Sequence, residues 1–234
     1  MRVHVAFTPA ERIDAPLAIV VDVLRATSTM TQALASGYER VLCCAEIDEA
    51  RALKEQEAPA VTGGERKTTK IPGFDFGNSP REYAGEPAAP TLVLSTTNGT
   101  RLLVAAVSSA ETVLVGSLLN LSALAEEVRA SGAEEVAILC AGVVGELALD
   151  DAYCAGRIAQ AIGGEATDSA TAAIRIAESY PSAEAGLAAS QSARNLLLSG
   201  LEADIAWCAR ESALDVVARF TRMVGTAAEV ALGD

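Results

Sequence analysis

The chain has 234 residues, of which 50% are hydrophobic but only 4% aromatic, so we expect an aliphatic core. Lys and Arg number 18 against 31 Asp and Glu, a net charge of −13 with no basic stripe, which argues against nucleic-acid binding. No apolar run approaches the roughly 20 residues that span a bilayer, and no signal-peptide pattern is present, so we expect a cytoplasmic protein with no membrane partner.

Cysteine and histidine offer little metal chemistry. The five cysteines include no CxxC pair, and we interpret them as small buried hydrophobic residues. The single histidine, His4, alternates with apolar residues, which favours a structural role. One histidine excludes a His-rich zinc site and argues against a Ser-His-Asp triad.

Strand and helix patterns alternate along the chain, which predicts an α/β fold. Strands are expected at residues 3–7, 17–23, 40–45, 60–62, 91–95, 112–115, 136–140 and 204–208. Helices are expected at 29–36, 47–56, from 80 onward, from about 101 to 108, and at 121–130, 150–162, 168–180 and 182–199. Residues 67–79 are interpreted as a functional loop, and the tail after 212 is ambiguous.

The segment 20–53 has a faint repeat about 71 residues later, at 92–124. We interpret the repeat as two related α/β halves that share a site. No linker separates them, so the chain is treated as a single unit, 1–234. Within it, two intertwined halves would span about 1–88 plus C-terminal elements and about 89–200.

Residues 19–31 carry the clearest functional pattern. A buried apolar strand ends at Val21 and is followed by Asp22, Arg25 and the hydroxyl of Thr27. Ligands bind at the carboxyl ends of strands in open α/β sheets. Arginine and a helix N-terminus favour phosphate, and a nearby carboxylate would need a cation such as Mg²⁺ between it and the anion. The alternative is an Asp22–Arg25 surface ion pair, and Thr29 with Gln32 has the form of a capping box.

Four further groups of polar side chains follow predicted strands or precede predicted helices. Three of them also have a simpler interpretation: an exposed turn for the first, helix capping for the second and dipole complementation for the last acids. The groups are Glu65 and Arg66 after two glycines; Asp75, Asn78 and Ser79 before a helix start; Thr96 to Arg101 as a second phosphate cradle; and Asp150 with Asp151 as a second source of metal-binding carboxylates.

Five motifs occur in one order: DVLRATST, GGER, GFDFGNSP, STTNGT and AGVVGELALDD followed by CAG. Together they resemble the 2-phosphosulfolactate phosphatase (ComB) family over at least residues 3–160. The resemblance implies a three-layer α/β/α fold of two similar halves. It also implies Mg²⁺-dependent hydrolysis of 2-phospho-3-sulfolactate to 3-sulfolactate and phosphate, on the route to coenzyme M.

The resemblance and the chemistry of the residues together give the predicted site. Catalytic roles are expected for Asp22, Arg25, Glu65 and Arg66. Phosphate or substrate binding is expected for Thr27, Asn78, Ser79, Thr96, Thr97, Asn98, Gly99, Thr100 and Arg101. Mg²⁺ is expected on Asp22, Asp75 and Asp151. The nucleophile is either water or Asp22 itself, and Arg81 or Arg101 would hold a second acidic group of the small anionic substrate.

Two alternatives from other classes stay open. One is a non-catalytic anion-binding or regulatory module of the same fold. The other is an assembly protein that interacts through its Ala/Leu-rich residues 183–199. The same segment and the aliphatic composition lead us to expect a homodimer.

Overall fold

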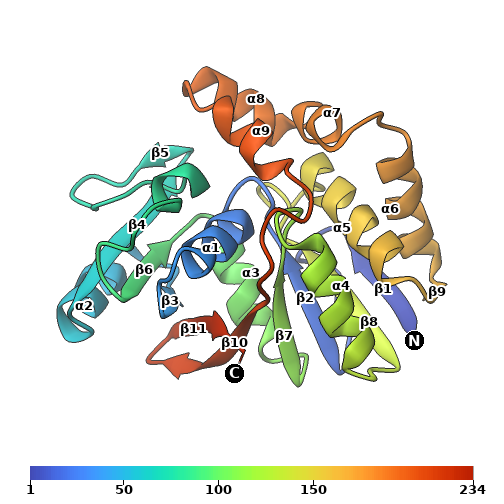
Figure 1. Cartoon of the computed structure of the whole chain (residues 1–234), viewed down its shortest axis with the longest axis horizontal. Helices are drawn as coiled ribbons and strands as arrows, with labels where there is room; N and C mark the ends of the chain where they lie inside the picture. The colour runs from blue at the N-terminus through green and yellow to red at the C-terminus, as the bar shows by residue number, and fades with distance from the viewer. Residues whose placement is uncertain (234) are drawn as a thin grey trace.

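The computed structural model describes residues 1–233 as helices around one mixed sheet of 11 strands (Figure 1). The spatial order is β5-β4-β6-β3-β11-β10-β7-β2-β8-β1-β9. The strands are β1 (Arg2–Ala6), β2 (Leu17–Val21), β3 (Arg40–Cys43), β4 (Ala60–Arg66), β5 (Thr69–Lys70), β6 (Thr91–Ser95), β7 (Thr112–Gly116), β8 (Glu135–Cys140), β9 (Glu165–Ala166), β10 (Ala218–Val224) and β11 (Ala227–Leu232).

The helices cover both faces of this sheet. They are α1 (Ala26–Ala35), α2 (Ile47–Gln56), α3 (Gly99–Ala106), α4 (Leu121–Ala130), α5 (Leu149–Ile162), α6 (Asp168–Glu178), α7 (Ala183–Ala188), α8 (Gln191–Leu198) and α9 (Ala203–Cys208), with a 3₁₀ turn at Pro80–Tyr83. The predicted α/β class is confirmed.

Alternation along the strands explains the layers, because successive side chains point to opposite faces. Ile19 and Ile138 join a core cluster with residues of α4, α5 and α6. Val20 belongs to a second cluster, which contains residues of α1 and α3. Leu42 contributes to a third, smaller cluster with residues of α2. β2 is buried along its whole length, as its apolar sequence predicts.

Two sets of parallel strands are joined by an antiparallel hairpin. In one set β2 pairs with both β7 and β8, and in the other β6 pairs with both β3 and β4. The hairpin of β10 and β11 lies between the sets and turns at Gly225, which has a positive φ of 61°. Strands from both predicted halves therefore occur in each set, and the division of the chain into halves stays a prediction.

Several local predictions were wrong. Residues 204–208 form helix α9 instead of a strand. Helix α1 begins at Ala26, three residues early, because the Asp22 carboxylate accepts a hydrogen bond from its first N–H group (3.3 Å). The Thr29–Gln32 capping box does not form, since the Thr29 hydroxyl donates to the carbonyl of Asn78 (2.9 Å).

The C-terminal third also differs from the sequence-based expectation. The single helix expected at 182–199 is two helices, and Ser190 caps the second by accepting from the N–H of Ala193 (3.0 Å). Thr167, and not Asp168, caps α6. The ambiguous tail forms β10 and β11. Within residues 1–233, no helix is long and apolar enough to cross a membrane.

Candidate active site

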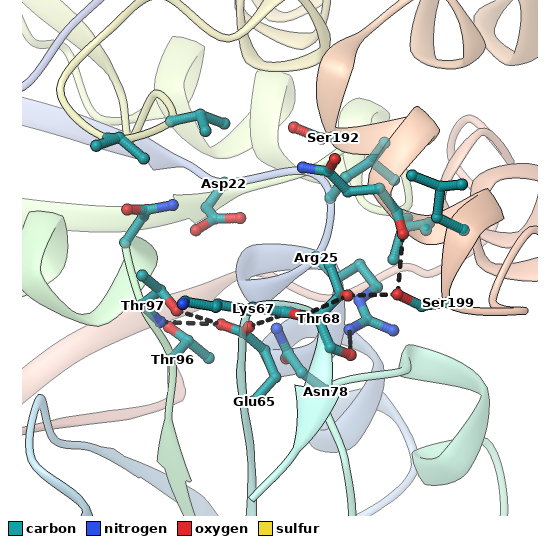
Figure 2. A pocket seen from close by; sticks show the side chains of 17 residues that line it. Asp22, Arg25, Glu65, Lys67, Thr68, Asn78, Thr96, Thr97, Ser192 and Ser199 are labelled. Carbon is teal, nitrogen blue, oxygen red and sulfur yellow. Dashed lines mark hydrogen bonds between the residues drawn. The ribbon is translucent and has the colours of Figure 1, made fainter.

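A cavity of about 420 Å³ lies beyond the carboxyl ends of β2, β4, β6 and β8. Figure 2 shows Thr96 and Thr97 on one side of it and Ser192 and Ser199 of the α8 region on the other. Its lining residues are Asp22, Leu24, Arg25, Glu65, Lys67, Thr68, Asn78, Thr96, Thr97, Asn98, Val143, Val144, Ser192, Asn195, Leu196, Leu198 and Ser199. Seven of the residues predicted for the site therefore share one cavity.

Asp22 follows β2 directly and is nearly buried, with 9% of its surface exposed. Its own N–H donates to the Thr27 hydroxyl (3.2 Å), which gives that predicted phosphate-binding residue a role in fixing the loop. The pKa of Asp22 is raised to about 6, mainly by burial and also by the charge of Glu65, while the hydrogen bond from the N–H of Ala26 opposes the shift. A Cβ atom at Gly99 would lie 2.7 Å from Asp22 Oδ2, so glycine allows α3 to begin beside this carboxylate.

Glu65, at the end of β4, holds two loops of the cavity together. Its Oε1 accepts hydrogen bonds from the N–H (3.0 Å) and hydroxyl (2.8 Å) of Thr97. Its Oε2 accepts from the N–H of Thr68 at 2.8 Å. The carboxylate thus fixes the predicted phosphate cradle after β6 relative to the turn that follows β4.

That turn has an unusual backbone. β4 and β5 pair with a two-residue connection, Lys67 and Thr68, and both have positive φ angles of 52° and 65°. Such a turn favours Asn and Gly, and other residues in this region cost about 1–3 kcal/mol each. Surrounding contacts stabilise it: the Thr68 hydroxyl bonds to that of Ser199 (2.6 Å), and its carbonyl accepts from Arg25 Nη2 (3.3 Å).

Arg25 lines the cavity but is already paired. Its Nη1 lies 2.7 Å from Oδ2 of Asp204, and both side chains are buried. The other oxygen of Asp204 accepts from the predicted site residue Ser79 at 2.6 Å. The alternative of an Asp22–Arg25 surface ion pair is wrong. Sequence reasoning missed Asp204 because it placed this residue in a late strand.

The remaining predicted phosphate-binding residues lie in and around the cradle. The Thr96 and Thr100 hydroxyls are 3.1 Å apart, and Thr100 itself does not line the cavity. Asn98 lines the cavity just before α3. Asn78 also lines it, and its Oδ1 is buried without a hydrogen-bond partner among residues 1–233.

The other predicted arginines lie outside the cavity lining. Arg66 donates to the Ala45 carbonyl (2.6 Å) and the Ser95 hydroxyl (3.0 Å), which ties neighbouring loops together. The Arg101 side chain is 68% exposed and pairs with Glu46 at 3.5 Å.

The three carboxylates predicted to bind Mg²⁺ do not converge. Asp75 pairs with Lys54 at 2.7 Å and accepts from the N–H of Thr62 at 2.7 Å. Against the effect of partial burial, these contacts lower its pKa to about 2. In the described part of the chain, no three His, Cys, Asp or Glu side chains form a metal-binding group.

Asp151 and its neighbour form a second group of acids behind the cavity. Asp151 accepts from the N–H groups of Val23 (2.9 Å) and Gly142 (3.0 Å). Burial, and then the charges of Asp150 and Asp22, raise its pKa well above the ordinary value. Burial also raises the pKa of Asp150 to about 7, although its Oδ1 accepts from the Ser192 hydroxyl (3.0 Å).

The donor chemistry nevertheless suits a hard cation. Asp22 and Glu65 both line the cavity and repel each other electrostatically. The unpartnered Oδ1 of Asn78 adds a neutral oxygen. Mg²⁺ commonly binds one or two carboxylates together with water and substrate phosphate oxygens, so these residues fit it.

Comparison with known proteins identifies relatives over almost the whole chain. A family model described as 2-phosphosulpholactate phosphatase matches residues 4–222. A protein of Thermus thermophilus named "Probable 2-phosphosulfolactate phosphatase" is 40% identical over 216 residues, 90% of each chain. Proteins of the same name from Clostridium acetobutylicum (35% over 218 residues, 90% of this chain and 92% of the relative) and Thermotoga maritima (36% over 218 residues, 92% and 93%) also match.

Proposed function

The chain belongs to the 2-phosphosulpholactate phosphatase family, and we propose that it hydrolyses 2-phospho-3-sulfolactate to 3-sulfolactate and phosphate with Mg²⁺ as cofactor. The observation that carries the proposal is the shared cavity of Asp22, Arg25, Glu65 and the Thr96–Asn98 loop. Acid, guanidinium and hydroxyl groups lie together where a phosphate ester can reach them.

Hydrolysis of a phosphate monoester dianion requires neutralisation of charge on the phosphoryl group. Arg25 supplies a fixed positive charge, which its contact with Asp204 keeps in one orientation. The N-terminus of α3 and the Thr96 hydroxyl supply hydrogen-bond donors. When bound, Mg²⁺ would add positive charge beside the phosphoryl oxygens, and Asp22, Glu65 and Asn78 are the residues that would hold it.

Asp22 is the carboxylate best placed for chemistry. Glu65 already accepts three hydrogen bonds that hold the loops, whereas Asp22 accepts a longer one, 3.3 Å, from the N–H of Ala26 and faces the N–H of Gly99. Asp22 then either orients and deprotonates the attacking water or attacks phosphorus itself. Its raised pKa of about 6 means that it becomes ionised near neutral pH.

The proposal is tested by phosphate release from a set of small phosphorylated hydroxy acids. We expect turnover of 2-phospho-3-sulfolactate that EDTA abolishes and Mg²⁺ restores, and we do not expect Zn²⁺ to be the native ion. Full activity after exhaustive chelation would remove the metal from the proposal. Binding of these ligands without any phosphate release would instead favour the non-catalytic anion-binding module.

A further inference from the structure

We propose that Lys67 in the β4–β5 turn and Asn195 on α8, from opposite walls of the cavity, bind the acidic groups of the substrate that carry no phosphate, a sulfonate and a carboxylate. This inference rests on the proposed function, since it assumes a phosphorylated substrate with further acidic groups. Both residues line the cavity that contains Asp22.

The charges around the cavity single out Lys67. Its lining contains two basic residues, Arg25 and Lys67. In the proposed function Arg25 serves the phosphoryl group, and its guanidinium is also held by the buried carboxylate of Asp204. Lys67 forms no ion pair with any carboxylate of residues 1–233. A ligand with several acidic groups, entering a cavity that already contains two carboxylates, finds its available positive charge on this lysine.

The backbone of the turn holds Lys67 at the cavity. The next residue, Thr68, is fixed by three hydrogen bonds: its N–H donates to Glu65, its carbonyl accepts from Arg25, and its hydroxyl bonds to that of Ser199. Lys67, with a left-handed φ of 52°, therefore precedes a residue that three contacts hold in place. Figure 2 shows the Lys67 side chain extending toward Thr97 below Asp22.

Helix α8 supplies the second donor from the facing wall. Ser192, Asn195 and Ser199 are spaced three and four residues apart, so they lie along one side of the helix. Asn195 Oδ1 accepts from Gln191 Nε2 at 3.0 Å, which leaves the Asn195 amide N–H₂ group to donate to a ligand. The Ser192 hydroxyl is already used, because it donates to Asp150.

The arginines expected from the sequence for this role are less suitable. Arg101 is mostly exposed and pairs with Glu46. Arg81 lies 4.0 Å from the carboxylate of Asp204. Neither lines the cavity, so Lys67 and Asn195 replace them as the candidate subsite.

The experiment is calorimetric titration of the full chain with 3-sulfolactate and, separately, with inorganic phosphate. We expect Lys67→Met to weaken 3-sulfolactate binding at least 10-fold and phosphate binding by a much smaller factor, with Lys67→Arg recovering most of the loss. Asn195→Ala should weaken 3-sulfolactate binding about 3-fold or more. The matched control is Lys70→Met: this lysine lies in the same hairpin, outside the cavity lining, and donates to the Asp75 carbonyl at 2.7 Å.

Equal losses for both ligands would place Lys67 at the phosphoryl group and overturn the proposal, as would unchanged or undetectable 3-sulfolactate binding. The experiments distinguish failure of the subsite from failure of the proposed function. A chain that binds 3-sulfolactate through Lys67 but releases no phosphate contradicts the function and retains the subsite. Turnover in which Lys67→Met leaves the preference for 2-phospho-3-sulfolactate over glycerol 2-phosphate unchanged contradicts the subsite alone.

Discussion

The Arg25 guanidinium donates to the carboxylate of Asp204 across 2.7 Å, joining residues 179 positions apart in the chain. Arg25 follows β2 and Asp204 lies in α9, so the pair connects the loop after the carboxyl end of β2 to the C-terminal helices. Asp204 also accepts from Ser79. Asp204 does not line the cavity, but it fixes Arg25, which does. We therefore interpret Asp204 as a positioning residue.

Asp204→Asn should leave the Arg25 charge buried without a compensating carboxylate. Breaking a buried ion pair from one side costs about 3–5 kcal/mol, and urea denaturation monitored by circular dichroism would measure this loss in the free energy of unfolding. The matched control is Asp48→Asn, which breaks an exposed pair with Arg51 and should change stability little. Equal stability of the two variants would show that Arg25 does not depend on Asp204.

Arg25→Lys should preserve the charge but lose the forked geometry that contacts both Asp204 and the Thr68 carbonyl. We expect kcat/KM for phosphate release to fall roughly 10²-fold, equivalent to about 2.7 kcal/mol. Steady-state kinetics with saturating Mg²⁺ measures the change, and Arg51→Lys on the exposed face of α2 serves as the control. Wild-type kinetics in Arg25→Lys would show that the fork does not contribute.

The part of the site that follows β2 could be predicted because its signal is local. A fully apolar strand ends at Val21, so the polar residue that follows, Asp22, must lie just beyond the carboxyl end of this strand. Asp75 is predicted as a metal-binding acid from the family resemblance and its place before a helix start. Its partner, Lys54, lies 21 residues earlier, and no local pattern indicates that contact.

Asp204 and Lys67 show what the sequence could not provide. Asp204 lies in a segment of six residues, Ala203–Cys208, which is too short for periodicity to distinguish a strand from a helix. Lys67 and Thr68 lack the Asn-Gly signature of the turn that they form, since tertiary contacts of Thr68 impose the conformation. The backbone conformation and the role of both residues depend on contacts with segments far away in the sequence.

The pH dependence of stability should follow the buried acids. The pKa is raised from 3.8 to about 6 for Asp22 and about 7 for Asp150, so the folded chain binds protons more tightly than the unfolded chain in this range. The contribution of these acids to the free energy of unfolding is then greatest near pH 4 and is lost as pH rises from about 4 through about 7. Asp75, whose pKa is lowered to about 2, stabilises the folded chain throughout this window, and its contribution is lost only below about pH 4.

Melting temperatures at pH 5 and pH 8 in metal-free buffer measure this effect. We expect the lower value at pH 8 and a smaller difference in Asp150→Asn, whose side chain cannot ionise. A melting temperature that rises from pH 5 to pH 8 would contradict the assignment of these acids.

Assembly is a further prediction. We propose a homodimer that involves α8, where Leu197 and Leu198 are 55% and 88% exposed. Sedimentation at micromolar concentration should give twice the chain mass of 24.0 kDa, and Leu198→Asp should shift the species toward one chain. A single species of 24.0 kDa in the wild type would rule the dimer out under these conditions.

The most direct test of the proposed active site is phosphate release by Asp22→Asn with 2-phospho-3-sulfolactate and saturating Mg²⁺, beside a melting curve. Asparagine is nearly isosteric and keeps an oxygen for the N–H of Ala26, so the fold should persist. We predict a larger loss of kcat/KM than in Arg25→Lys, because the substitution removes the acting carboxylate. A folded and fully active Asp22→Asn variant would contradict the assignment of this cavity as the active site.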